Sequence, residues 1–460
     1  MKEFDLKSDN NLKVHFIGIG GISMSGLAEI LLDYGFNVSG SDSNNSNIIN
    51  RLIDKGATIH IGHDAENIKD QDLVVYTAAV KADNPELIKA KELNIPTVNR
   101  AEFLGQIMKH YEKRIAVAGV HGKTTTTSLL SVIMCNANLD PTIMVGGELD
   151  AIGGNVRPGK SPYFLTEACE YVESFLKLYP TVGIVLNIDK DHLDFYSGID
   201  QIISSFKKFI RLIPKDGYLI TSSDDENAMK AAKGCNCNLV TFGIKNNANW
   251  MTKNICYDKN GFGEFDVYHN GEYYDRFKLR IPGEHNISNS LCAIACADLF
   301  HIEKDIIKSS LSEFSGTHRR FEVKGEFSGV KVIDDYAHHP TEIKATLKAA
   351  RNYPHNKLWC VFQPHTYSRT IKLLDEFSHA FSDVDELILA DIYAAREKDT
   401  GEISSKILAD KIGKNGVSVR YLPSFNEIAD FIAKNASPGD IVLTMGAGDV
   451  YKVGDMLLEK

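Results

Sequence analysis

The sequence predicts three consecutive α/β domains, and two observations favour this fold class. Short apolar runs rich in β-branched residues alternate with helical patterns along almost the whole chain, which is typical of parallel sheets. At 460 residues the chain is also too long for a single hydrophobic core. We therefore expect a Rossmann-like N-terminal domain at residues 1–110, a central domain at 111–317 and a Rossmann-like C-terminal domain at 318–460.

The elements follow in order. The first domain should begin with a buried strand at 13–19, a helix at 25–35 and a strand at 37–42, with further strand-like runs at 73–79 and 95–98. The central domain should hold strands at 115–120, 163–168 and 181–189. Between 251 and 281 the pattern changes, and an Asn-Gly pair at 270–271 predicts a hairpin in a small antiparallel β patch. A helix at 286–300 follows, and residues 315–323 are interpreted as a linker. The C-terminal strands are expected at 330–336, 357–363, 386–392, 417–422 and 440–446.

Composition narrows the class of protein. The net charge of −10 and the pI near 5.9 argue against a nucleic-acid partner. No apolar run reaches the roughly 20 residues that a membrane span needs, and the first residues lack the apolar core of a signal peptide. The eight cysteines contain no Cys-x-x-Cys pair, which favours reduced thiols over a sulfur metal site. We expect a cytoplasmic enzyme with no membrane partner, as a monomer or weak homodimer.

A glycine-rich turn, GIGGISMSG at 18–26, follows the first strand. Such a turn and the next helix N-terminus can hold a diphosphate. The third glycine of a dinucleotide fingerprint would stand at position 23, where this chain has Ser23, while Asp42 follows the second strand, where ribose hydroxyls are normally bound. A nicotinamide enzyme, a sugar-nucleotide binder and a purely structural turn all remain open. The candidate residues are Gly18, Gly20, Gly21, Ser23, Met24, Ser25 and Asp42.

A second motif, GVHGKTTTT at 119–127, lies between a strand and a helix, as a phosphate loop does. The usual first glycine is replaced by Val117. In this interpretation Lys123 meets the β- and γ-phosphates of ATP and Thr124 offers its hydroxyl to Mg²⁺; the alternative is a plain turn with an exposed lysine. The candidate nucleotide ligands here are Gly119, His121, Gly122, Lys123, Thr124 and Thr125. The central domain is therefore expected to be a P-loop ATPase domain.

Two further strand ends in this domain carry polar side chains. Glu167 ends one predicted strand and could hold the metal. Asp191, His192 and Asp194 follow the next, where an imidazole beside carboxylates could be a second ligand or the group could be a capped turn. In the C-terminal domain DDYAHHP, FQPHTYSR and MGAGD each follow a strand directly. They should share the carboxyl edge of one sheet, where open α/β folds bind ligands.

These motifs in this order resemble the Mur ligases, which build the peptide stem of bacterial cell wall. GVHGKTT, TEA, NIDKDHLD, GEHNISNSLCA, GTHRRFE and DDYAHHPTEI carry the resemblance across nearly the whole chain. It implies an ATP- and Mg²⁺-dependent ligase that joins L-alanine to the lactyl carboxylate of UDP-N-acetylmuramate through an acyl phosphate. The first domain would hold the UDP-sugar.

The resemblance also implies roles for individual residues. Thr124 and Glu167 would bind one metal ion, and Glu167 with His192 a second. Asn286 and Asn289 would lie beside adenine and ribose, although from spacing alone two polar residues at i and i+3 merely share a helix face. Arg320 would reach the phosphates and Asp335 the nucleotide. The residues expected to face the amino acid are Tyr336, His338, His365 and Arg369.

Two positions depart from the family pattern. Thr366 stands where some relatives carry a second arginine, and Phe206 falls near the position of a carbamylated lysine, so we expect no carbamate. Three alternatives remain: a recycling ligase that attaches a tripeptide to the same sugar nucleotide, a nicotinamide dehydrogenase, and a non-catalytic sugar-nucleotide sensor.

Overall fold

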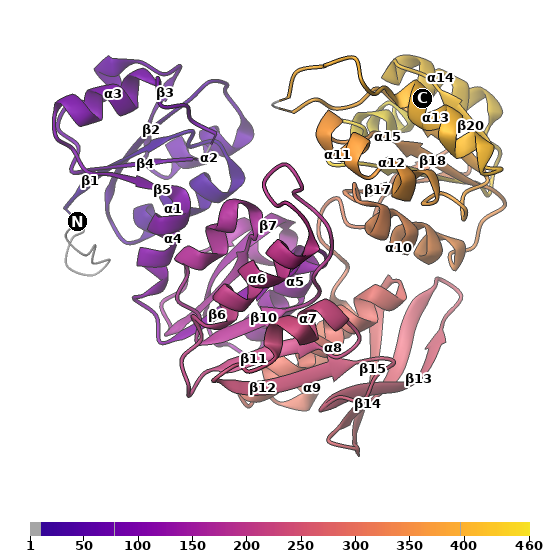
Figure 1. The fold of residues 1–460 in the computed structure, drawn as a ribbon, viewed down its shortest axis with the longest axis horizontal. Helices are drawn as coiled ribbons and strands as arrows, with labels where there is room; N and C mark the ends of the chain where they lie inside the picture. The colour runs from indigo at the N-terminus through magenta and orange to yellow at the C-terminus, as the bar shows by residue number, and fades with distance from the viewer. Residues whose placement is uncertain (1–10, 78, 396) are drawn as a thin grey trace.

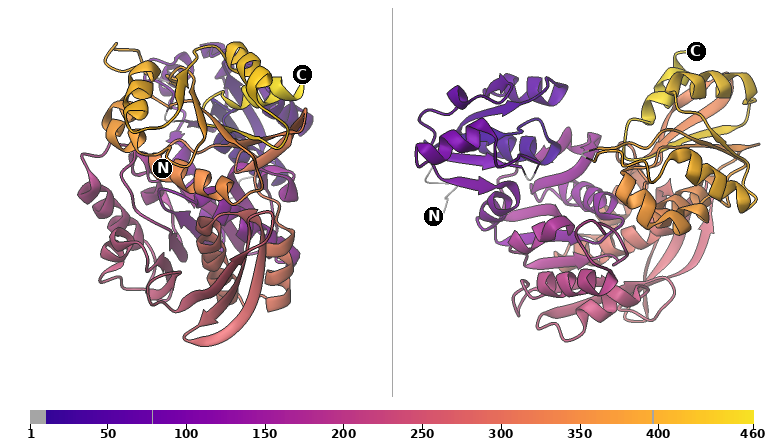
Figure 2. Two further views of the ribbon diagram at one scale, coloured as in Figure 1. Left: turned by 90° about the vertical axis from the view of Figure 1, so that its right-hand side faces the viewer. Right: turned by 45° about the horizontal axis from the view of Figure 1, so that its top comes forward.

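Three α/β units built on parallel-dominated sheets make up the protein, which confirms the predicted fold class (Figure 1). The structure is a computed structural model that describes residues 11–77, 79–395 and 397–460. Residues 1–10 of the predicted first domain and Ala78 of the predicted run at 73–79 lie outside the described residues. In Figures 1 and 2 the central unit lies between the N-terminal unit and the C-terminal unit and meets both.

The N-terminal unit is a parallel five-stranded sheet in the order β3-β2-β1-β4-β5. Its strands are β1 (Lys13–Ile17), β2 (Asn37–Asp42), β3 (Thr58–Ile61), β4 (Leu73–Tyr76) and β5 (Thr97–Asn99). Its helices are α1 (Ile22–Asp33), α2 (Asn47–Asp54), α3 (Pro85–Glu92) and α4 (Arg100–Met108), with a short 3₁₀ turn, η1 (Ala65–Asn67). β3 was not predicted, because its side chains are largely exposed and give no apolar run.

The central unit has a ten-stranded sheet in the order β15-β14-β13-β12-β11-β10-β6-β9-β7-β8. Its strands are β6 (Lys113–Ala118), β7 (Thr142–Leu149), β8 (Gly154–Arg157), β9 (Tyr163–Ala168), β10 (Val182–Val185), β11 (Tyr218–Ser222), β12 (Asn238–Gly243), β13 (Trp250–Tyr257), β14 (Phe262–His269) and β15 (Glu272–Pro282). Its helices are α5 (Lys123–Asn136), α6 (Ile199–Ile210), α7 (Glu226–Ala232), α8 (Glu284–Leu299) and α9 (Lys304–Glu313), with 3₁₀ turns η2 (Asp150–Ile152) and η3 (Tyr171–Lys177).

The antiparallel patch predicted at 251–281 is present but is not separate. β13, β14 and β15 pair antiparallel with one another, and β13 pairs parallel with β12, so the patch extends the central sheet. The turn between β14 and β15 places Asn270 at φ 51° and Gly271 at φ 88°, the left-handed geometry that favours Asn-Gly in tight hairpins. The structure therefore confirms the hairpin predicted at residues 270–271.

The C-terminal unit has a six-stranded sheet in the order β16-β17-β21-β18-β19-β20. Its strands are β16 (Glu322–Phe327), β17 (Val330–Asp335), β18 (Leu358–Phe362), β19 (Glu386–Leu389), β20 (Val419–Tyr421) and β21 (Ile441–Met445). Its helices are α10 (Pro340–Arg351), α11 (Tyr367–Lys372), α12 (Leu374–Ser378), α13 (Ser405–Lys414), α14 (Phe425–Asn435) and α15 (Tyr451–Leu458). Only β16 is antiparallel to its neighbour. The predicted linker at 315–323 was too long, because Glu322 and Val323 already belong to β16.

The N-terminal and central units share a hydrophobic core. Met24 and Leu27 of α1 belong to the same buried cluster as Met144 of β7 and Val156 of β8. Beside it the Asn155 side-chain amide donates to the Ile22 carbonyl at 2.8 Å. The contact between the central and C-terminal units contains the polar site described below, and Leu193 of the central unit also packs against the hydrophobic core of the C-terminal unit. Among the described residues, no helix combines the length and apolar character that a membrane crossing requires.

Candidate active site

The phosphate loop joins β6 to α5 and is held by a neighbouring strand end. Gly119 at φ 143° and Gly122 at φ 83° adopt left-handed backbone that favours glycine. The His121 N–H donates to the Asn187 Oδ1 at 2.8 Å, and the Asn187 amide donates back to the His121 carbonyl at 2.9 Å. A Cβ at Gly122 would lie 2.6 Å from Asn289 Oδ1. Asn187, just beyond β10, therefore fixes the loop, and it was not among the predicted residues.

Lys123 is paired inside the protein. Its ammonium donates to the Gly119 and Val120 carbonyls and lies 3.0 Å from the Glu170 carboxylate, whose side chain is only 2% exposed. Burial by itself would lower the pKa of Lys123, but the negative charge of Glu170 outweighs it and raises that pKa to about 12. The same pairing holds the pKa of Glu170 below its usual range, against the effect of burial. Lys123 thus stays charged, and Glu170 is a site residue that the sequence reading missed.

Two of the predicted metal ligands, Thr124 and Glu167, lie beside Gly146 and Gly147 in β7. The Glu167 carboxylate accepts from the Gly146 N–H at 2.6 Å. A Cβ at Gly147 would lie 3.4 Å from the Thr124 methyl group. His192 has other carboxylate neighbours: its Nε2 lies 3.6 Å from Glu170 and 3.9 Å from Asp191. His192 also adopts φ 49°, a strained conformation for a residue with a Cβ and one that is common at functional sites.

A cavity of about 480 Å³ lies between the phosphate loop and the C-terminal unit. Of the predicted residues it is lined by His121, Gly122, Thr125, Asn286, Asn289, Arg320 and Asp335. The structure therefore brings together, around one cavity, residues between positions 121 and 335 whose roles had to be predicted separately from the sequence. Lining residues that were not predicted include Asn187, Asp189, Asp225, His285, Thr341 and Glu342. The motifs NIDKDHLD and DDYAHHPTEI contain four of these six, which was the available signal.

Three of the predicted nucleotide ligands already have internal partners. Asn286 donates to the Pro282 carbonyl at 2.7 Å, and the Asn289 amide donates to the Asn286 oxygen at 3.2 Å. Asp335 accepts from the backbone N–H groups of Phe321 and Ala337, each at 2.8 Å. Burial raises the pKa of Asp335 to about 6. Asp335 thus fixes the backbone beside the cavity, a role that the motif alone did not indicate.

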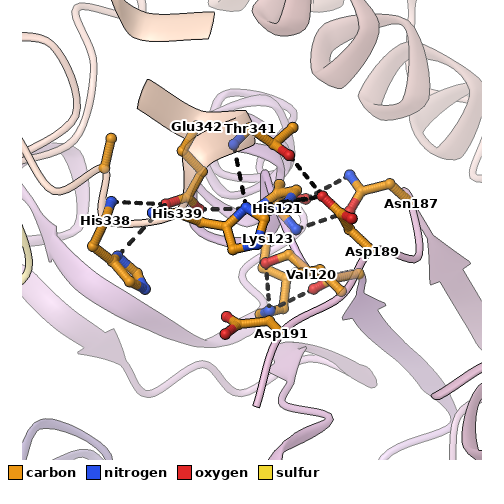
Figure 3. Close-up of polar contacts among 12 residues, drawn as sticks. Val120, His121, Lys123, Asn187, Asp189, Asp191, His338, His339, Thr341 and Glu342 are labelled. Carbon is orange, nitrogen blue, oxygen red and sulfur yellow. Dashed lines mark hydrogen bonds and ion pairs between the residues drawn. The ribbon is translucent and has the colours of Figure 1, made fainter. Parts of the chain in front are cut away.

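The polar groups of the cavity wall join the two units (Figure 3). His121 of the phosphate loop lies 3.1 Å from both Asp189 and Glu342. The Thr341 hydroxyl donates to Asp189 at 2.7 Å, and His339 Nε2 lies 2.8 Å from the Lys190 carbonyl. Burial would lower the pKa of His121, but its hydrogen bonds with the two carboxylates raise it to about 9.

The residues predicted to face the amino acid lie in a connected row, since the His365 ring centroid is 5.8 Å from the His338 ring centroid and Arg369 Nη1 is 3.1 Å from His365 Nδ1. A second cavity, of about 280 Å³, is lined by His365, Thr366 and Arg369 along with Asp191 and His192. The Arg369 guanidinium is occupied, because its Nη2 lies 2.9 Å from the Asp191 carboxylate. A nearly buried cation needs a counter-charge, and here the central unit supplies it.

The other two, His338 and Tyr336, adjoin them on the same edge, with ring centroids 5.5 Å apart. His338 Nδ1 lies 3.0 Å from the Tyr336 carbonyl, and burial lowers the pKa of His338 to about 3, so the imidazole is neutral at pH 7. The Tyr336 ring lies against the guanidinium groups of Arg319 and Arg320, at 4.8 and 5.1 Å from its centroid. The Tyr336 ring therefore contacts both the linker arginines and the His338 ring.

In the N-terminal unit Asp42 stabilises the glycine turn. Its carboxylate accepts from the Gly20 N–H at 2.9 Å, and Gly18 has φ 81°. Ser23 accepts from Arg100 at 3.0 Å. Of the other predicted residues, Met24 is in the hydrophobic core, and the Ser25 hydroxyl donates to the Ile22 carbonyl at 2.9 Å. The side chains of these last two residues are therefore not available to a ligand, and Gly21 contributes only the N-cap of α1.

Comparison with known proteins agrees with this geometry over the whole chain. Three family models match in order: Mur ligase family, catalytic domain, at residues 13–112; Mur ligase middle domain at 117–297; and Mur ligase, glutamate ligase domain, at 319–448. A UDP-N-acetylmuramate–L-alanine ligase of Clostridium acetobutylicum is 57% identical over 457 residues, which cover 99% of this chain and 100% of the relative.

Two solved structures share the fold. A crystal structure of UDP-N-acetylmuramate–alanine ligase from Thermotoga maritima matches with a TM-score of 0.83 and 30% identity, over 98% of this chain and 99% of that one. A murein peptide ligase from Psychrobacter arcticus matches with a TM-score of 0.71 and 26% identity, over 98% of each chain. With all three domain models in order and a 57% identical relative of the same length, the chain belongs to the Mur ligase family.

Proposed function

We propose that this protein is an ATP-dependent, ADP-forming ligase that joins L-alanine to the lactyl carboxylate of UDP-N-acetylmuramate in peptidoglycan precursor synthesis. The full-length relative from Clostridium acetobutylicum with this activity in its name supports the choice of substrates. The alternative, attachment of a tripeptide to the same sugar nucleotide, has weaker support, since the murein peptide ligase is less similar in sequence and in fold than the alanine ligase from Thermotoga maritima.

The observation that carries the proposal is the cavity between the phosphate loop and the C-terminal unit. Its walls combine His121 and Gly122 of the loop with Arg320 and Asp335 from beyond the central sheet. Its volume of about 480 Å³ falls within the range of small-molecule sites. ATP bound there would place its phosphates at the N-terminus of α5, where backbone N–H groups and the helix dipole favour anions.

The reaction needs positive charge at the transferred phosphoryl group. A lactyl carboxylate oxygen attacks the γ-phosphorus, ADP leaves, and the amine of L-alanine then attacks the acyl carbon and expels phosphate. Lys123 is charged and preorganised beside this position. When ATP binds, its phosphates would replace Glu170 as the counter-ion of Lys123. Removing such a preorganised charge typically costs several kcal/mol of transition-state stabilisation.

The oxygen atoms of Thr124 and Glu167 fit a hard cation. Hydroxyl and carboxylate oxygens are the ligands that Mg²⁺ prefers, and Thr124 is the second residue of α5, the helix that follows the loop. We propose that these two residues hold Mg²⁺, which would neutralise phosphate charge. His192, beside Glu170 and Asp191, is assigned to a second ion.

The substrates would meet between the units. UDP-N-acetylmuramate would lie on the glycine turn of the first domain, residues 1–110, ATP on the second, 111–317, and L-alanine on the third, 318–460. Arg369 lines the second cavity, and the α-carboxylate of L-alanine would compete with Asp191 for its guanidinium. His338 and His365 lie on the same edge. A monomer or weak homodimer remains our prediction for the assembly.

A trapping experiment tests the reaction. With UDP-N-acetylmuramate, ATP and Mg²⁺ but no amino acid, hydroxylamine should intercept the acyl phosphate as a hydroxamate, and added L-alanine should suppress that product. Lys123→Ala is the matched control and should give neither hydroxamate nor ADP. Release of ADP by the wild type with no hydroxamate under these conditions would rule out the acyl-phosphate route.

A further inference from the structure

Two imidazoles and a carboxylate converge where the central unit meets the C-terminal unit (Figure 3). His121 comes from the phosphate loop, Asp189 from the segment after β10, and His339 from the N-cap of α10. One ligand atom of each residue lies within 4.8 Å of those of the other two. His121 Nε2 is 3.1 Å and His339 Nδ1 is 3.8 Å from the same oxygen, Asp189 Oδ2. Ligand atoms about 2.1 Å from a zinc ion lie about 3.4 Å apart when the geometry is tetrahedral.

We propose that His121, Asp189 and His339 form a binding site for a zinc-class transition-metal ion that links the central and C-terminal units. The site is separate from the proposed Mg²⁺ ligands, which are Thr124 and Glu167. It does not depend on which amino acid the enzyme uses.

The partners of the two imidazoles leave one nitrogen of each ring on the side of Asp189 Oδ2. His121 Nδ1 lies 3.1 Å from Glu342 Oε1, an acceptor, so this nitrogen can keep its proton while a metal ion displaces the proton that Nε2 shares with Asp189 at 3.1 Å. His339 Nε2 lies 2.8 Å from the Lys190 carbonyl, also an acceptor, so its Nδ1 is unprotonated; this lone pair accepts from the Thr341 N–H at 3.3 Å, a bond that a metal ion would replace. Metal-ligating histidines almost always donate their other N–H to a carboxylate or carbonyl in this way. The arrangement therefore has the outer partners of a metal site as well as its ligands.

The ligand set selects the class of ion. Two imidazole nitrogens and one carboxylate suit Zn²⁺, whereas Mg²⁺ prefers oxygen ligands. Three protein ligands leave the fourth tetrahedral position open. The Thr341 hydroxyl donates to Asp189 Oδ2, one of the three ligand atoms, at 2.7 Å. His121, Asp189 and Thr341 also line the 480 Å³ cavity. Solvent or a phosphate oxygen of a nucleotide could take the fourth position.

Because His339 belongs to α10 and the other two ligands to the central unit, a bound ion would tie the units together. The contact they make without the ion includes hydrogen bonds and ion pairs around Asp189 and Glu342 and the pair of Arg369 with Asp191. Zinc should therefore hold the units closed and resist the opening that exchange of nucleotide requires. The regulatory consequence is that zinc at low concentration should inhibit turnover even when Mg²⁺ is saturating.

Cobalt provides the test, because four-coordinate Co²⁺ absorbs visible light far more strongly than six-coordinate Co²⁺. The nucleotide-free, full-length protein is titrated with Co²⁺ and then with Zn²⁺ as competitor. We expect one equivalent with the intense four-coordinate spectrum, displaced by Zn²⁺. His339→Asn, which keeps an N-cap residue for α10, should weaken binding at least about tenfold and abolish the spectrum, and Asp189→Asn should do the same.

Two control variants separate this site from others. His355→Asn removes an imidazole of the same unit whose Nδ1 lies 2.6 Å from the Tyr353 carbonyl, outside the cluster, and should bind Co²⁺ as the wild type does. His192→Asn should also retain the spectrum. The proposal is overturned if His339→Asn keeps the four-coordinate spectrum, if His192→Asn loses it, or if the wild type binds Co²⁺ only in six-coordinate form.

Discussion

Replacing Glu170 with glutamine tests whether the phosphate-loop lysine depends on a buried counter-charge. The Glu170 side chain is 2% exposed, and its carboxylate lies 3.0 Å from the Lys123 ammonium. At that distance the Coulomb attraction is about 5.5 kcal/mol for an effective dielectric constant near 20, and desolvation offsets part of it. Removing one partner of a buried pair typically costs about 3–5 kcal/mol. The Gly119 and Val120 carbonyls still accept from Lys123, so we expect a loss near the lower end, about 3 kcal/mol.

The two tryptophans lie in different units, so the unfolding of the central unit can be followed separately. Trp250 lies in β13 of the central unit and Trp359 in β18 of the C-terminal unit. In a Trp359→Phe background, urea unfolding followed by Trp250 fluorescence reports the free energy of unfolding of the central unit. Glu173→Gln is the matched control, since Glu173 pairs with Lys208 at the surface, where the side chains are 30% and 54% exposed, and should cost less than about 1 kcal/mol. Equal losses for the two variants would refute the buried-pair argument.

The same pair predicts an effect of ATP. The triphosphate should replace Glu170 as the counter-ion of Lys123, so ATP should raise the free energy of unfolding of Glu170→Gln by more than it raises that of the wild type. An equal or smaller increase in the variant would show that Lys123 does not change partners when the nucleotide binds.

Three further predictions concern the other assigned residues. Arg369→Lys keeps a charge beside Asp191 but loses the planar guanidinium. In steady-state kinetics the KM for L-alanine should therefore rise about tenfold, while the KM for ATP changes little. The reverse pattern would show that L-alanine does not bind at Arg369. Glu167→Gln should lower kcat about 10²–10³-fold and raise the Mg²⁺ concentration needed for the half-maximal rate. If that Mg²⁺ concentration were unchanged, Glu167 would not be a metal ligand. The pKa of His121 is raised to about 9, so its stabilisation of the contact between units is complete below about pH 6.5 and is lost as the pH rises through about 9. Hydrogen exchange in α10, corrected for the intrinsic effect of pH, should accelerate over that window in the wild type but not in His121→Gln.

Local patterns were enough to predict much of the fold. The strands with buried faces, such as β6 and β18, gave continuous apolar runs, and the Asn-Gly turn between β14 and β15 gave a hairpin signal. β16 was missed although Ser328 and Gly329, at φ 47° and 79°, form a tight turn of the same kind. The reason is that β16 is a half-exposed edge strand, so its side chains do not alternate clearly.

The site was harder to predict, because its pairings join distant segments. The sequence has two glutamates, 167 and 170, near the end of β9, and nothing local shows that the second turns inward to Lys123. It does so because η3 begins just after it and contains left-handed residues, Val172 and Glu173. Likewise the pairing of Arg369 with Asp191 spans 178 positions and depends on how two sheets dock. Residue types indicated the chemistry, whereas the partners required the tertiary structure.

The identity of the accepted amine tests the central claim most directly. The enzyme is incubated with UDP-N-acetylmuramate, ATP and Mg²⁺ together with equimolar L-alanine, glycine, L-serine and a cell-wall tripeptide, and the sugar-nucleotide products are separated by mass. The account predicts that the L-alanyl product dominates and that ADP forms in equal amount. Loss of one methyl contact in an apolar pocket costs roughly 1–3 kcal/mol, so the glycine product should be about 10- to 200-fold less abundant. A dominant tripeptide product, or ADP release without any amide product, would contradict it.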